Sequence, residues 1–168
     1  MGESGPFKET GFVDAFDPRT RKRLPNSQLQ LDSDTPASTL YVRYVDANGD
    51  QVGPFPIRFD PLAAIEKDAR KTLEMTSGSW VAFGGYSGLL VYVTHLVTYR
   101  CGIREARIGI DSTVPDRKLA FPPCDLRDPF KIPEKAELYL RVPPTTKLVS
   151  IELTYQDGSV SEVKTFRH

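Results

Sequence analysis

Two histidines carry the acid–base chemistry that this sequence can offer. His95 and His168 are the only imidazoles in 168 residues, and general acid–base or triad catalysis near neutral pH most often uses one. His168 is the terminal residue, so a hydrolase would have to combine His95 with a carboxylate. His95 stands in an apolar run, which favours a hydrogen-bonded core imidazole. We therefore predict no catalytic residue and no enzyme, and we keep a hydrolase that uses His95 as the second alternative.

Cys101 and Cys124 are the only cysteines, and the segment between them contains turn-forming glycines and prolines. A disulfide between them would close a loop of about 23 residues and stabilise the fold by roughly 3 kcal/mol. The alternative of two buried free thiols stays open. Pairing would favour an extracytoplasmic location, periplasmic or secreted, because cytosolic thiols are kept reduced. Without that pairing the location is unknown.

The sequence predicts no metal site and no cofactor. The cysteines and histidines lack the close spacing of structural zinc ligands, and the glycine-rich segment 84–88 precedes strand-like residues, not the helix of a phosphate loop. Asp46, Asn48 and Asp50 have the opening spacing of a calcium loop. However, Ile57 occupies the position of the bidentate glutamate, so we interpret this segment as a turn.

Aromatic side chains are the main candidates for recognition. Sheet proteins bind through loops or exposed faces, where a ring can stack on a sugar or fill a pocket of a partner. The candidate ligand-binding residues are Trp80, Tyr86 and Tyr92. They support a carbohydrate-binding module as the first alternative function.

Charge excludes several classes of partner. Lys+Arg and Asp+Glu both number 22, so the formal net charge is zero and no global field attracts nucleic acid or anionic lipid. The cationic run 19–23 is interpreted as a solvated loop. No apolar run approaches the roughly 18 residues that span a bilayer. We expect a soluble chain with a protein or glycan partner, and the sequence leaves its oligomeric state open.

Alternating apolar residues predict mainly antiparallel β structure. The β-branched and aromatic segment 39–45 and the alternating residues of 55–59 flank Asn48-Gly49, which predicts a hairpin with one buried face. A second hairpin is predicted over 149–166, with its turn at Asp157-Gly158.

One short helix is predicted over 61–76. Asp60 is a good N-cap, Pro61 suits the first helical position, and apolar residues recur at helical spacing up to Ser77-Gly78.

The segment Leu89–Cys101 is predicted to be a long central strand, because its odd positions form a nearly apolar face. Arg104–Asp111 would return antiparallel to it, and Glu137–Val142 adds a further strand. About seven or eight short strands predict a β-sandwich of immunoglobulin-like or fibronectin-like architecture.

The predicted organisation is an irregular N-terminal arm over 1–37 and a sandwich domain over 38–168. Two similar turn motifs, at 44–49 and 155–158, leave open a division into two lobes near 60–78. Without a catalytic constellation, the favoured function is a non-catalytic binding or interaction module, an accessory or assembly domain of a larger protein.

Overall fold

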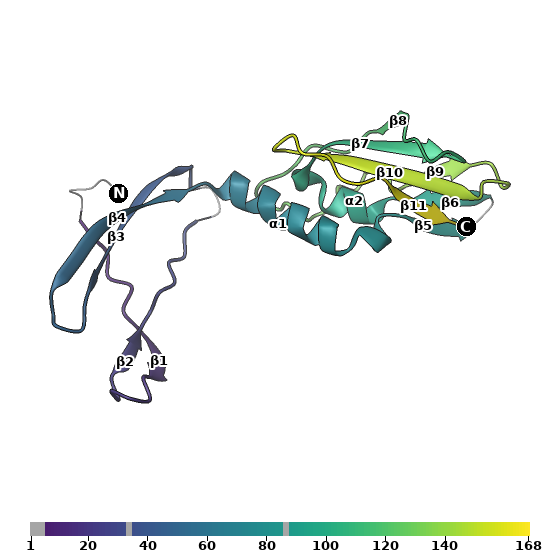
Figure 1. Cartoon of the computed structure of the whole chain (residues 1–168). Coiled ribbons are helices and arrows are strands. Elements are labelled where there is room, and N and C mark those ends of the chain that lie inside the picture. Colours follow the sequence, from purple (N-terminus) through teal and green to yellow (C-terminus); the bar gives the residue numbers. More distant parts are fainter. Residues whose placement is uncertain (1–5, 33–34, 86–87) are drawn as a thin grey trace. The chain divides into compact units, whose positions relative to one another are not determined.

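The computed structural model describes residues 6–32, 35–85 and 88–168 (Figure 1). The chain is mainly β, and all strand pairs among these residues are antiparallel. It forms two compact units, Met1–Pro61 and Leu62–His168. The predicted domain limits, an arm over 1–37 and a domain over 38–168 with an alternative division near 60–78, stay predictions.

The first unit consists of two hairpins (Figure 1). Its strands are β1 (Phe12–Phe16), β2 (Arg23–Pro25), β3 (Ser38–Val45) and β4 (Gln51–Phe59). β1 pairs with β2 inside the segment that was expected to be irregular. β3 pairs with β4 in the predicted hairpin, with a register shift between Val42 and Tyr44.

The connection between β3 and β4 is a turn held by Asp46. Its carboxylate oxygen Oδ1 accepts hydrogen bonds from the backbone N–H groups of Asn48 at 2.8 Å and Asp50 at 3.0 Å. The bonds from Asp50 and Asn48 lower the pKa of Asp46, because they stabilise its ionised form. Gly49 supplies a positive φ of 93°. The interpretation of this segment as a turn is therefore confirmed.

The second unit contains two antiparallel sheets and two helices. Its elements are α1 (Pro61–Met75), β5 (Ala82–Gly85), β6 (Leu89–Tyr92), α2 (Thr94–Thr98), β7 (Ile103–Ile110), β8 (Arg117–Leu119), β9 (Tyr139–Val142), β10 (Leu148–Tyr155) and β11 (Lys164–Arg167). The strand orders are β5-β6-β9 and β11-β10-β7-β8. The helix predicted over 61–76 is confirmed by α1, and the predicted C-terminal hairpin by β10 and β11.

One apolar core joins these elements. The register of β10 and β7 places Ile151 opposite Ile108 and Leu153 opposite Ala106, so these four buried side chains share a face. Val91 of β6 and Leu73 of α1 belong to the same cluster of buried residues. Both sheets and the longer helix therefore depend on one shared interior.

The predicted long strand Leu89–Cys101 is wrong. The strand ends at Tyr92, and the chain continues through α2 and a 3₁₀ turn over Arg100–Gly102. The buried residues Val93, Leu96 and Val97 are spaced as a helix requires. Because most positions in this run are apolar, strand and helix periodicity both fit it, and the pattern alone could not decide between them.

The strand pairing also differs from the expectation. β7 pairs with β10 and β8, whereas the strand predicted over 104–111 was to pair with the Leu89–Cys101 segment. The neighbours of β6 are β5 and β9. The two sheets are small and do not close, so the immunoglobulin-like or fibronectin-like architecture is not confirmed.

Two interactions hold the irregular segment after β8, which contains Pro123 and Cys124, against the core. Cys101 and Cys124 form a disulfide, which decides between the two alternatives for these cysteines. The neighbouring Arg100 is only 3% exposed, and its guanidinium donates hydrogen bonds to the carbonyl oxygens of Pro123 at 3.0 Å and Val97 at 3.2 Å. These bonds compensate for the burial of the cation, because each carbonyl replaces lost water.

Reducing the disulfide should lower the free energy of unfolding by about 3 kcal/mol, because the unfolded chain regains the entropy of an open loop. Urea denaturation with and without reductant measures this change. The double variant Cys101→Ala/Cys124→Ser is the control, and its midpoint should not respond to reductant. An unchanged wild-type midpoint, with reduction verified by thiol titration, would contradict the expectation.

Candidate interaction surface

Trp80, the first of the three predicted binding residues, belongs to the core. Its side chain is 1% exposed, and its indole Nε1–H donates a hydrogen bond to the carbonyl oxygen of Leu73 at 2.9 Å. The ring therefore fixes α1 against the sheets and has no surface to offer a ligand. Tyr86 lies outside the described residues.

Tyr92 is half-buried and packs beside Tyr139, with ring centroids 5.7 Å apart and an interplanar angle of 58°. A Cβ at Gly84 would come within 2.8 Å of the Tyr92 ring, so the ring lies over the backbone of β5. Tyr139 is the more exposed of the two, at 44%. A ligand-binding role for Tyr92 stays a prediction.

His95 lies in α2 and forms a structural contact with the end of α1. Its Nε2 is 2.7 Å from the Thr76 hydroxyl, and that hydroxyl also donates a hydrogen bond to the carbonyl oxygen of Thr72 at 2.6 Å. Since a hydroxyl has one proton to donate, Nε2 of His95 is the donor toward Thr76. Burial lowers the pKa of His95, and no carboxylate contributes to that shift. His95 is therefore a packed side chain whose Nε2 already forms a hydrogen bond with Thr76.

The described part of the chain supports neither a metal site nor a membrane-spanning helix. Within residues 6–32, 35–85 and 88–168, no three His, Cys, Asp or Glu side chains lie together as a metal site requires. In the same ranges, no helix is long and apolar enough to cross a membrane.

The carboxylate of Glu105 is occupied by two surface ion pairs. It contacts Arg107 at 2.7 Å and Lys118 at 2.6 Å.

The most distinctive surface is one face of the β3–β4 hairpin. The register pairs Val42 with Phe55, and the ring of Phe55 stacks with Tyr44 at a centroid distance of 6.1 Å. Ile57, two residues beyond Phe55, lies on the same face. The exposed fractions of the four side chains are 42% for Val42, 54% for Tyr44, 47% for Phe55 and 49% for Ile57. We call these four residues the hairpin face.

The unit that carries the hairpin face has no core of its own. Every fully buried apolar residue of the described chain lies between Ala69 and Tyr155. Between residues 6 and 61, the described residues are all exposed or half-buried. Exposed large apolar side chains are also found on the β1–β2 hairpin and after it, at Phe12, Val13, Phe16, Leu24 and Leu29.

Within its own unit, the 39–59 hairpin does not bury the face that the sequence predicted to be buried. The alternating pattern identified the apolar face correctly, but the pattern cannot say whether the chain itself covers that face. A two-stranded hairpin is marginally stable at best in water, since it needs a third strand or a packed helix to cover its apolar side. The hairpin face therefore has the properties of a contact surface.

Comparison of this chain with family models, with curated proteins and with solved structures gives no match. The functional argument therefore rests on its own residues.

The position of His95 predicts a pH-dependent stability. Because burial lowers its pKa below the ordinary value of 6.5, the unfolded chain binds the proton more readily. The stabilisation is complete above that value and is lost as the pH falls through the folded-state pKa. His95→Gln should remove this contribution, so that the variant loses less stability than the wild type on acidification.

Urea denaturation at several pH values measures the difference between the two proteins. Thr76→Val is the control, because it keeps His95 and should keep the pH response. Parallel pH profiles for the wild type and His95→Gln would show that this imidazole does not titrate as its burial requires.

Proposed function

We propose that this chain is a non-catalytic assembly module, and that the hairpin face is where it associates with a second copy of itself. The observation that supports the proposal is the combination described above: a continuous apolar face on a unit without a core. Burying such a face contributes roughly 25 cal/mol for each Å² of apolar surface removed from water. Association therefore supplies the stabilisation that the first unit lacks.

A second copy is the partner that the charge of the chain and the apolar hairpin face favour. With 22 cations and 22 anions, two copies do not repel each other through net charge. The hairpin face carries no charged side chain, so two such faces can pack in a self-complementary, two-fold interface without burying a charge. An interface of this kind forms between two identical chains.

The compartment proposed for this assembly is extracytoplasmic. The Cys101–Cys124 disulfide is compatible with such a location, because disulfides persist in oxidising compartments and are rare in the cytosol.

Val42→Asp should convert the self-associating chain into a monomer. The new carboxylate would lie in the centre of the hairpin face, where association would strip its water without providing a partner charge. Sedimentation velocity across a range of micromolar concentrations measures the change in mass. We expect the dissociation constant to rise at least about a hundredfold, since burying an unpaired charge costs several kcal/mol.

Thr39→Asp is the matched control. It adds the same carboxylate to the same strand but on the opposite face, where Thr39 is exposed and pairs with Arg58. This variant should associate like the wild type. A wild-type chain that remains monomeric throughout, or equal effects of the two substitutions, would overturn self-association through the hairpin face.

A further inference from the structure

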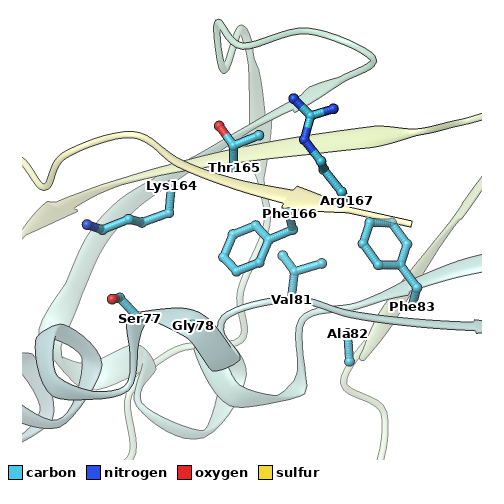
Figure 2. A pocket seen from close by; sticks show the side chains of 9 residues that line it. All are labelled: Ser77, Gly78, Val81, Ala82, Phe83, Lys164, Thr165, Phe166 and Arg167. Atoms are coloured by element: carbon cyan, nitrogen blue, oxygen red, sulfur yellow. The ribbon is translucent and has the colours of Figure 1, made fainter.

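A separate groove lies in the second unit, between the edges of its two sheets (Figure 2). Its volume is about 530 Å³, and it is open to solvent. One wall is β11, and the other is the chain that leads from the end of α1 into β5. The groove is independent of the hairpin face, which belongs to the first unit.

One wall of the groove is the outer edge of β11, which pairs with no other strand among the described residues, and the opposite wall runs from Ser77 into the edge strand β5. β11 is the terminal strand of the four-stranded sheet, and β5 is the terminal strand of the three-stranded sheet. The groove is lined by the consecutive residues 164–167 of β11 and 81–83 at β5. Because successive side chains of a strand point to opposite faces, consecutive lining residues mean that the backbone edge itself borders the groove.

The hydrogen-bond pattern of β11 shows which backbone groups are available. The N–H of His168 donates to the carbonyl oxygen of Lys147 at 3.1 Å, so this is a hydrogen-bonded pair of the antiparallel ladder. Such pairs alternate with pairs that exchange no hydrogen bond. By this alternation, Phe166 and Lys164 bond to β10, whereas Thr165 and Arg167 direct their N–H and C=O groups away from it.

The side chains provide an apolar floor and two cations, Lys164 and Arg167, of which Lys164 lies on the same face of β11 as Phe166. Figure 2 shows Phe166 pointing toward Val81, with Phe83 beside them. Lys164 extends along the groove on the side of Ser77 (Figure 2). The described residues that line the groove include no aspartate and no glutamate. The ammonium group of Lys164 contacts Glu162 at 2.9 Å, but the Glu162 side chain is 85% exposed, and such surface pairs contribute little and exchange readily.

We propose that this groove binds an extended, acidic segment of a partner protein, which adds to β11 as a further strand. The backbone groups of Thr165 and Arg167 would pair with the segment. An apolar side chain of the segment would cover Phe166 and Val81, and a carboxylate would replace Glu162 at Lys164. Strand addition obtains its affinity from main-chain hydrogen bonds and its specificity from the alternating side chains. The segment would therefore be recognised by extended shape and one negative charge.

Two labelled synthetic peptides test the proposal on the full-length protein. Both have acetylated and amidated ends and alternate valine with threonine, and they differ only in a terminal glutamate or a terminal lysine. Fluorescence anisotropy measures affinity, and amide NMR measures which N–H groups become protected. We expect the glutamate peptide to bind more tightly and to protect the N–H groups of Thr165 and Arg167. Failure of both peptides to bind would overturn the proposal.

Thr165→Pro removes the N–H that faces the groove without removing a bond to β10, because a proline is tolerated at a strand edge. It should weaken binding about fivefold to tenfold, as expected for one lost hydrogen bond. Thr165→Val keeps the N–H and should bind like the wild type. Equal affinities for the proline and valine variants would overturn strand addition.

Lys164→Glu provides a second variant that leaves the backbone unchanged. It should reverse the preference, so that the lysine peptide binds more tightly than the glutamate peptide. An unchanged preference would overturn the role of Lys164.

Peptide binding at the groove and self-association through the hairpin face can be tested independently of each other. Val42→Asp should leave peptide affinity unchanged, and Thr165→Pro should leave the mass in sedimentation velocity unchanged. Dissociation of the oligomer by Thr165→Pro would instead assign the groove to a second copy of this chain, and would overturn the proposed partner.

Discussion

The burial of apolar surface in a single core is the interaction on which this structure depends. Trp80, Leu73 and the facing residues of β7 and β10 are removed from water within the second unit. The first unit contributes none of the buried residues among those described. Because conformational entropy opposes folding in every ordered segment, a unit without a fully buried residue has little apolar burial to offset that entropy. Its exposed hairpin face is the surface through which further stabilisation can come.

The small size of the sheets produces both candidate surfaces. A two-stranded sheet leaves an apolar face uncovered, and sheets of three and four strands leave edges at β5 and β11. Proteins usually protect such edges with charge, proline or covering loops, because an open edge is a template for another strand. Here the groove at β11 has Lys164 beside it. A charge beside an edge discourages indiscriminate pairing, and in the proposed complex it would select a segment of opposite charge.

Local signals in the sequence predicted local structure well, and they failed where only tertiary contacts decide. Asp60-Pro61 and the helical spacing that follows predicted α1, and Asn48-Gly49 and Asp157-Gly158 marked two real hairpins. The apolar run from Leu89 was compatible with strand and helix, and packing decided the outcome after Tyr92. Trp80 was a binding candidate because its type says nothing of its burial. Nothing in the sequence distinguished the exposed hairpin face from a buried one.

Gly102 lets α1 approach the disulfide-closed loop very closely. A Cβ there would lie 2.9 Å from the Cβ of Ala69 and 3.0 Å from the backbone nitrogen of Arg70, so the chain touches α1 backbone to backbone. Cys101, which is cross-linked to Cys124, is the adjacent residue. Any side chain at position 102 would therefore push α1 away from the loop that the disulfide closes, so the absence of a Cβ sets how closely the helix and this loop approach.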